Sequence, residues 1–438
     1  MQPIVEPRLL SCGIACLTLV IGSTTVSAGD WPHWRGPHRD GRVDEPSGWS
    51  PGRAWCSGEP RWRTNVGQGG TSPLVIGDRV YVMGWRKGRD SLYCLDRRTG
   101  KTIWQQQYPS PPYGRHSKGD QYFYGGPSST PEYDPASGLL WTLSVDGELR
   151  CWDTHRDGRM VWRINLYDTY RVPQRRKLTR HGHRDYGYTT SPLVHGKWVV
   201  VEVGAPDHGN LIAFDKQTGK ELWRSESRDP AGHSGGPLPI SVRGKPCLAI
   251  VTQKHLLVAS LAPDSPGKTV GQAPWVTDYA NSIAAPGTDG THLYLTSNYN
   301  LNRLVKFAVE RPVLREVWRT RHPSKVCCPV VDETSVYFAW RDIWCFDRET
   351  GKVRWRAGLS LGDPGSMILT RDARLVAWTG KGRLILLENA RRSPDRYREL
   401  ARTREWFEED AWPHVVLAQG DFYLKDRMGN LICLPAVP

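Results

Sequence analysis

Hydrophobic residues occur along this chain in short runs that alternate with polar residues, and no long stretch follows the 3.6-residue period of a helix. Short alternating runs bounded by turn residues are typical of β-strands. Residues 71–82 read as a strand, a turn containing Gly77 and a second strand, and residues 190–201 repeat this pattern around Gly196. The pattern therefore predicts an all-β fold built from repeated hairpins.

A fixed phrase follows these hairpins. It reads LDRRTGKTIW at 95–104, FDKQTGKELW at 214–223 and FDRETGKVRW at 346–355, and a copy with one extra residue lies at 152–162. The Asp can accept hydrogen bonds from the backbone just after it, the Gly allows a positive φ, and the Trp can pack from the following strand. Each hairpin and its phrase would form a four-stranded antiparallel unit. Units begin at 71–73, 129–131, 190–192, 235–237, 284–286, 327–329, 365–366 and 412–413.

Eight four-stranded units predict an eight-bladed β-propeller. The last unit has only three strands, near 414–418, 421–425 and 430–434. Residues 59–66 resemble a stray fourth strand, since Trp62 takes the place that Trp104 takes in the first phrase. We expect this N-terminal strand to close the ring, because pairing it with the last unit protects two open sheet edges; an unpaired arm is the alternative. Residues 59–438 would then be a single domain preceded by an arm at 29–58.

Residues 1–28 have the pattern of a signal peptide. Arg8 precedes an apolar run, and Val26-Ser27-Ala28 forms a small-residue cleavage site. A lipid anchor through Cys12 or Cys16 is the less favoured alternative, because neither lies in a convincing lipobox. No other apolar stretch approaches the roughly 20 residues that span a membrane. We therefore expect an exported protein, periplasmic or extracellular, without a transmembrane segment.

Four of the cysteines occupy one repeat position, which Ala213 fills in another unit. A position shared with alanine calls for a small buried side chain, so structural thiols are expected there rather than disulfides. These four are Cys94, Cys151, Cys345 and Cys433. The cysteines that remain after the leader are Cys56, Cys247 and the adjacent pair Cys327 and Cys328.

The phrase, in its extended form Leu-Tyr-small-Leu-Asp-x-x-Thr-Gly-x-x-x-Trp, resembles the repeat of the pyrroloquinoline-quinone (PQQ) superfamily, which includes quinoprotein alcohol dehydrogenases and the BamB lipoprotein. The opening DWPHWRGPHRDG at 30–41 is similar to the start of exported bacterial PQQ-like propellers. This motif marks the family and is silent about chemistry. The resemblance implies the propeller fold, but it does not by itself imply an activity.

The resemblance implies one enzymatic alternative, a PQQ- and calcium-dependent oxidoreductase of alcohols or sugars. In such dehydrogenases two adjacent disulfide-bonded cysteines face the quinone, and Cys327 and Cys328 are the weak candidates here. However, Cys328 takes the pre-proline place that Ser72, Thr130, Ser191 and Ala285 take elsewhere, so we favour a structural role. We find no haem motif and no recognisable metal spacing around Asp278, Asn281 or Asp363. No catalytic residue and no cofactor are therefore expected.

The formal net charge is +14. A basic cluster lies in the connection 171–184, and an aromatic loop contains Tyr113, Tyr122, Phe123 and Tyr124. Export makes nucleic acid an improbable partner, so an anionic glycan, a lipid headgroup or an acidic protein segment fits the charge better; a merely solvated loop is the alternative. The cluster consists of Arg171, Arg175, Arg176, Lys177, Arg180, His181, His183 and Arg184.

We predict a binding or scaffold protein that acts through the mouth of its central funnel. Every blade delivers the entrance of its innermost strand to the same axis, so loops of unrelated sequence converge there. The partner is predicted to be a protein, a glycan or another anionic ligand. The predicted surface consists of Thr71, Ser72, Arg175, Arg176, Arg180, His183, Arg184, Tyr188, Thr189, His233, Asn281, Cys327, Asp363 and Trp412.

Overall fold

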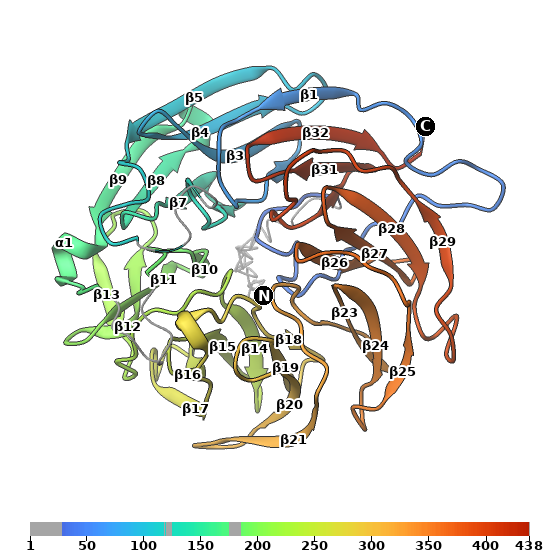
Figure 1. Ribbon diagram of the computed structural model, residues 1–438. Coiled ribbons are helices and arrows are strands. Elements are labelled where there is room, and N and C mark those ends of the chain that lie inside the picture. Colours follow the sequence, from blue (N-terminus) through green and yellow to red (C-terminus); the bar gives the residue numbers. More distant parts are fainter. Residues whose placement is uncertain (1–28, 118, 120–124, 175–184, 438) are drawn as a thin grey trace, which may run out of the picture.

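The computed structural model describes residues 29–117, 119, 125–174 and 185–437. Eight four-stranded antiparallel sheets stand side by side around a central axis (Figure 1). This confirms the predicted eight-bladed propeller. In each blade the strands follow one another from the axis to the rim, and we number the blades in chain order.

The first four blades have the following strands. Blade 1 consists of β2 (Leu74–Ile76), β3 (Arg79–Arg86), β4 (Arg89–Asp96) and β5 (Thr102–Pro109). Blade 2 consists of β6 (Glu132–Asp134), β7 (Leu139–Leu143), β8 (Glu148–Asp153) and β9 (Arg159–Asn165). Blade 3 consists of β10 (Leu193–His195), β11 (Trp198–Ala205), β12 (Gly209–Asp215) and β13 (Glu221–Arg224). Blade 4 consists of β14 (Leu238–Val242), β15 (Lys245–Val251), β16 (His255–Ser260) and β17 (Thr269–Pro274).

The other four blades complete the ring. Blade 5 consists of β18 (Gly287–Thr288), β19 (His292–Ser297), β20 (Arg303–Val309) and β21 (Leu314–Thr320). Blade 6 consists of β22 (Val330–Val331), β23 (Ser335–Trp340), β24 (Asp342–Asp347) and β25 (Val353–Arg356). Blade 7 consists of β26 (Gly365–Leu369), β27 (Arg374–Thr379), β28 (Arg383–Glu388) and β29 (Glu399–Arg402). Blade 8 consists of β30 (Val416–Ala418), β31 (Asp421–Lys425), β32 (Asn430–Pro435) and β1 (Trp62–Asn65).

The short helices lie in connections between strands. They are η1 (Thr154–Arg156), α1 (Leu166–Tyr170) and η2 (Asp278–Ala280). In the described part of the chain no helix is both long and apolar enough to cross a membrane.

The ring is closed by the N-terminal strand, as predicted. β1 pairs antiparallel with β32, with Trp62 opposite Cys433. Figure 1 shows the blue β1 beside the red β32, so the two ends of the propeller domain share one blade. Pairing of the first and last strands leaves neither of them as a free edge on that side.

The turn of the repeated phrase contacts a tryptophan of the preceding blade at four places in the ring. The Asp96 carboxylate accepts hydrogen bonds from the backbone of Arg98 and Thr99, and Gly100 adopts a φ of 68°. A Cβ atom on Gly100 would lie 2.5 Å from the Trp62 ring, and the Trp62 indole N–H donates to the Arg97 carbonyl at 2.8 Å. The same contact joins Trp104 to Gly158, Trp162 to Gly219 and Trp318 to Gly351. The glycine is thus required by its turn and by the tryptophan of the preceding blade.

The arm at 29–58 packs along the inner ends of the blades. Trp31 exchanges backbone hydrogen bonds with Val75 of β2, and Leu369 of β26 donates to the Gly41 carbonyl at 2.8 Å. Glu45 accepts from the backbone of the turn between β30 and β31. In Figure 1 the blue arm passes close to the centre of the ring. The arm therefore ties together the neighbouring blades 7, 8 and 1.

Each cysteine in the described residues is buried and carries a free thiol. The four at the shared repeat position are fully buried, which confirms the expected structural role. Burial raises the pKa of the Cys94, Cys345 and Cys433 thiols to about 12. These thiols therefore stay protonated and unreactive at neutral pH.

Candidate ligand pocket on the axis

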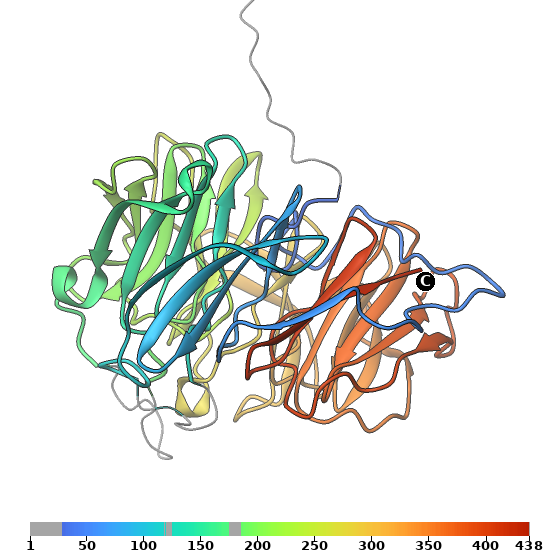
Figure 2. The ribbon, with the colours of Figure 1, turned by 90° about the horizontal axis from the view of Figure 1, so that it is seen from above.

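A pocket of about 210 Å³ lies on the axis, at the entrances of the innermost strands. Figure 2 shows η2 on the face opposite to the one where the arm begins, and Asn281, which follows η2, lines the pocket. The pocket is therefore reached from the face that carries η2. Every blade contributes to its wall, in chain order through Gly70, Ser128, Thr189, Ser234, Asn281, Lys325, Ser366 and Trp412.

The arm supplies the floor of this pocket. Trp34 lines the pocket and packs against Ala284, Ala285 and Cys328. A Cβ atom on Gly235 would lie 2.2 Å from the Trp34 ring, so the backbone of blade 4 needs a glycine to approach it. Because Trp34 and the buried residues behind it occupy the axis, the pocket is blind at this end.

Arg35 fixes the arm directly behind Trp34. Its guanidinium is fully buried and donates to the carbonyls of Pro286 and Pro329, both at 2.8 Å, and to that of Asp40 at 2.9 Å. Arg39 and His33 both contact the buried carboxylate of Glu132 in β6. Burial by itself would raise the pKa of Glu132, but the charge of Arg39 holds that pKa below its usual value. The family motif at 30–41 therefore closes the axis, a role that its sequence did not reveal.

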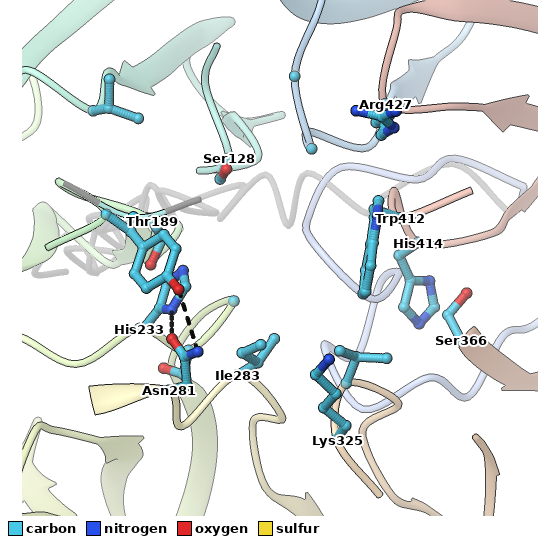
Figure 3. Close-up of a pocket in the computed structure, with 18 of the residues that line it drawn as sticks. Ser128, Thr189, His233, Asn281, Ile283, Lys325, Ser366, Trp412, His414 and Arg427 are labelled. Carbon is cyan, nitrogen blue, oxygen red and sulfur yellow. Dashed lines mark hydrogen bonds between the residues drawn. The ribbon is translucent and has the colours of Figure 1, made fainter. Parts of the chain in front are cut away.

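One wall of the pocket is a fixed polar network. The Asn281 amide donates to the Tyr299 hydroxyl at 3.0 Å and to the Tyr186 hydroxyl at 3.3 Å, so its oxygen accepts from His233 Nδ1 at 2.9 Å. The His233 ring stacks on Tyr186 at 4.0 Å. Figure 3 shows Thr189, His233 and Asn281 together on this side. The Asn281 side chain therefore fixes the orientation of the His233 ring in this wall.

The facing wall carries a cation and indole rings. Lys325 donates to Asp363 at 2.8 Å and lies 5.9 Å from the centre of the Tyr299 ring. Asp363 also contacts Arg341 at 3.3 Å. Partial burial by itself would raise the pKa of Asp363, but the two cations hold that pKa below its usual value. Figure 3 shows Lys325, Trp412 and His414 across the pocket from His233. The pocket thus places an ammonium group beside aromatic surface.

Two hydroxyl groups in the wall have no hydrogen-bond partner within the described structure. They are Thr189 Oγ1 and Ser234 Oγ, and their residues are 5% and 0% exposed. The neighbouring Thr190 donates to the Ser234 carbonyl at 3.2 Å, which places the two segments in contact. Buried polar groups are normally satisfied by protein, water or ligand. Both oxygens are buried behind the surface of the wall, so they do not face the open space of the pocket.

The structure brings only part of the predicted surface to the pocket. Thr189, His233, Asn281 and Trp412 line it, whereas Asp363 reaches it only through Lys325. Tyr188 is buried and donates to the Val203 carbonyl. The remaining predicted positions, Arg175, Arg176, Arg180, His183 and Arg184, lie outside the described residues.

Thr71 and Ser72 do not line the pocket, because they bond within the ring. Thr71 donates to the Met83 carbonyl, and the Ser72 hydroxyl accepts from the backbone of His414 at 2.9 Å. Thr130 and Ser191 accept from the backbone of the preceding blade in the same way. These pre-proline side chains therefore link neighbouring blades around the axis.

The surface predicted from the sequence omits several residues that line the pocket. Ser234 is adjacent to His233, so its place could have been inferred from the repeat alignment. Lys325 lies two residues before the cysteine pair, and a lysine beside an innermost strand is a usable signal of a charged pocket wall. Trp34 and Tyr299 approach from the arm and from the turn between β19 and β20, and no repeat position indicates them.

The adjacent cysteines are free thiols, and Cys328 lines the pocket whereas Cys327 is buried behind it. Cys328 Sγ accepts from the backbone of Ala285 at 3.3 Å, and Cys327 Sγ accepts from that of Ala339 at the same distance. Burial raises the pKa of the Cys327 thiol to about 12. Cys328 thus takes the linking role that Thr130 and Ser191 have elsewhere.

The lining residues do not fit a calcium-bound quinone of the dehydrogenase type. Ca²⁺ takes carboxylate and carbonyl oxygens as ligands. Among the described residues that line the pocket there is no Asp or Glu, and the described chain holds no group of three or more His, Cys, Asp or Glu side chains that could bind a metal. Asp363, which contacts the lining residue Lys325, is held by two cations. The site therefore supports no chemical step that uses a calcium-bound quinone.

Fold and pocket together define a PQQ-like propeller with a blind central funnel. A family model described as outer membrane protein assembly factor BamB matches residues 54–131 and 89–357. The chain belongs to this family. The solved structure of BamB from Moraxella catarrhalis covers 85% of this chain and all of its own, with a TM-score of 0.54 and 14% identity.

Quinoprotein dehydrogenases are relatives over part of their length. The quinohemoprotein alcohol dehydrogenase ADH-IIG of Pseudomonas putida is 28% identical over 157 residues, which is 35% of this chain and 19% of that protein. The dehydrogenase subunit of the quinone-dependent alcohol dehydrogenase of Gluconobacter oxydans is 30% identical over 167 residues, which is 37% of this chain and 19% of that protein. The chain thus spans about a fifth of these curated relatives.

The quinohemoprotein alcohol dehydrogenase of Comamonas testosteroni has a similar solved structure. It covers 93% of this chain and 78% of its own, with a TM-score of 0.61 and 13% identity. At this level of identity the likeness shows the shared fold alone.

Proposed function

We propose that this protein is an exported, non-catalytic binding propeller that holds an anionic ligand in its blind central pocket. The observation that carries the proposal is the composition of the pocket, where Lys325 lies among indole and phenol rings and no described lining residue is acidic. A low-dielectric, aromatic-walled site strengthens the attraction between an ammonium group and an anion. The leader pattern at 1–28 supports export.

The described lining residues include no pair of acid, base or nucleophile that orients one another for catalysis, which supports binding. Chemistry needs a nucleophile or base held by a second group. The described lining residues offer His233, whose Nδ1 is engaged by Asn281, and Cys328, whose thiol accepts the backbone N–H of Ala285. Binding at the BamB-like ring of blades therefore remains the proposal that the site favours over an alcohol or sugar oxidoreductase.

The proposal is tested on residues 29–438 with citrate as a small anionic probe. Calorimetry is expected to show saturable binding that weakens with added NaCl, because salt screens the attraction. Lys325→Met should weaken citrate binding about tenfold, which corresponds to the loss of one charged hydrogen bond. Lys352→Met, on an exposed turn, is the matched control. Dye-linked alcohol oxidation after reconstitution with PQQ and Ca²⁺ would overturn the proposal.

A further inference from the structure

We infer that the end of blade 6 that borders the pocket binds an acidic segment of a partner protein. This surface lies outside the pocket, so the inference goes beyond the proposed function and does not depend on it. We call it the blade 6 surface, and it consists of Arg321, His322, Arg341, Trp344, Arg356 and Leu359.

Two connections carry this surface from the rim to the pocket. Residues 321–325 lead from β21 to the pocket residue Lys325, and residues 357–364 lead from β25 to β26, whose first residue also lines the pocket. The turn between β23 and β24 lies against the second connection, because the Arg341 backbone N–H donates to the Gly362 carbonyl at 3.0 Å. Figure 1 shows β23, β24 and β25 in order from the centre toward the rim. The surface therefore extends outward from the pocket along one blade.

At the rim end, two arginines have no acidic partner among the described residues. They are Arg321 and Arg356, and both are exposed. Arg356 lies 5.8 Å from the centre of the Trp344 ring, and the centres of the His322 and Trp344 rings are 4.5 Å apart. Burial and the charge of Arg356 lower the pKa of His322, so its ring stays neutral at pH 7. The indole thus supports Arg356 by a cation–π contact, while the N–H groups of the guanidinium stay available to a carboxylate.

At the inner end, the protein itself shows how such an arginine binds a carboxylate. Asp363 accepts from Lys325 at 2.8 Å and contacts Arg341 at 3.3 Å. The Arg341 side chain is 66% exposed and lies 4.7 Å from the centre of the Trp340 ring. An arginine on an indole therefore holds an acid here, and Arg356 on Trp344 offers the same arrangement without an acid.

Apolar groups between the two ends favour a protein segment over a glycan. Leu359 lies midway along the second connection and is partly exposed, as is Trp344. The buried Asp342 does not repel an anion at the surface, because its carboxylate accepts from the backbone of Gly358 and Leu359. An extended chain that alternates acidic and apolar side chains can pair with the arginines and cover the leucine. A highly charged glycan would leave that leucine uncovered.

The cations are concentrated on blade 6 and are not spread evenly around the pocket. The connection from blade 7 to blade 8 at 403–411 also leads to the pocket, and it contains Glu405, Glu408, Glu409 and Asp410. The net charge of the chain therefore does not explain the blade 6 surface. An acidic segment is attracted to blade 6 and repelled by the 403–411 connection, which fixes its place on this face.

The test follows the fluorescence anisotropy of the fluorescein-labelled peptide Asp-Leu-Asp-Leu-Asp-Leu with residues 29–438. Binding is expected to be saturable and to weaken with added NaCl. Arg321→Gln with Arg356→Gln should weaken peptide binding about tenfold, because each exposed ion pair contributes part of the affinity. This variant should leave citrate binding in the pocket unchanged. Arg53→Gln with Arg243→Gln removes the same charge from other exposed sites and is the matched control.

Every other outcome decides against the inference or against the proposed function. Equal peptide affinities of the Arg321→Gln, Arg356→Gln variant and the unaltered protein would overturn the surface. Equal binding of the neutral peptide Asn-Leu-Asn-Leu-Asn-Leu would overturn the role of the carboxylates, and tighter binding of a chondroitin sulfate hexasaccharide would overturn the protein partner. If citrate binds and the acidic peptide does not, this inference fails alone. If the peptide binds as expected and citrate does not, the proposed function fails and the blade 6 surface stands.

Discussion

At the scale of single residues, the side chain before the inner-strand proline links neighbouring blades at four places in the ring. Ser72, Thr130 and Ser191 accept a backbone N–H of a neighbouring blade through a hydroxyl, and Cys328 does so through its thiol. A buried N–H that loses its acceptor costs about 1–3 kcal/mol. The small side chain at this position therefore has an energetic role beyond its size.

This role predicts different outcomes for two substitutions of Cys328. Cys328→Ala should lower the free energy of unfolding by about 1–2 kcal/mol, because the buried N–H of Ala285 loses its acceptor. Cys328→Ser supplies a hydroxyl and should cost less. Thermal unfolding of the two variants measures the difference. A redox or disulfide role would instead make both substitutions equivalent.

At the scale of elements, β1 belongs energetically to the last blade. It pairs with β32 and packs Trp62 on Gly100 of blade 1, as other phrase tryptophans do on the next blade. Removing β1 therefore opens a sheet edge and empties a tryptophan site at once. Loss of a buried tryptophan contact alone costs about 3–5 kcal/mol.

Two truncations separate β1 from the arm. A protein that begins at Glu59 lacks the arm, and one that begins at Gly67 lacks β1 as well. The second should melt about 5–10 °C below the first, as followed by circular dichroism and calorimetry. Equal melting temperatures would mean that β1 adds no stability to blade 8.

The elements were predictable from sequence because their signals are local. The phrase with its Gly100 and Trp104 marks a turn and a strand within a few residues, and Trp62 matches it closely enough to predict the ring closure.

The arm was not predictable, because its partners are distant: Arg35 binds carbonyls 251 and 294 residues away. Backbone carbonyls leave no trace in a sequence. Glu132 was a usable signal, since an acid replaces the apolar residue that follows the proline in β2 and β10.

Some residues of the pocket were likewise predictable from the sequence, and others were not. Thr189, His233, Asn281 and Trp412 were predicted from the repeat, because the entrance of an inner strand must face the axis. Trp34 was not, because it reaches the pocket from the arm. Lys325 occupies a predictable place, but its value as a cation depends on Asp363 and on the aromatic rings around it, which only the assembled ring brings together.

At the scale of the whole molecule, the arm, blade 8 and blade 1 meet at His414. Its Nδ1 donates to the Val415 carbonyl at 2.8 Å, its backbone N–H donates to Ser72, and its ring lies between 6 and 7 Å from the rings of Trp31 and Trp34. Burial, together with the charge of Arg35, lowers the pKa of His414 to about 3. The closed floor of the pocket therefore contains an imidazole that stays neutral.

This burial predicts a pH dependence of the whole fold. The unfolded chain binds a proton at His414 below a pH of about 6.5, whereas the folded chain does so only near pH 3. The unfolded state therefore binds more protons between these values, and the free energy of unfolding should fall as the pH falls through this window, by up to about 1.4 kcal/mol per pH unit from this group.

His414→Asn keeps a donor for the Val415 carbonyl and should flatten the slope between pH 6.5 and 4.5, as measured by urea unfolding. His38→Asn, at an exposed site of the arm, is the matched control and should leave the slope unchanged. Equal slopes in the His414→Asn and unaltered proteins would show that His414 titrates normally and that the floor of the pocket is open to water.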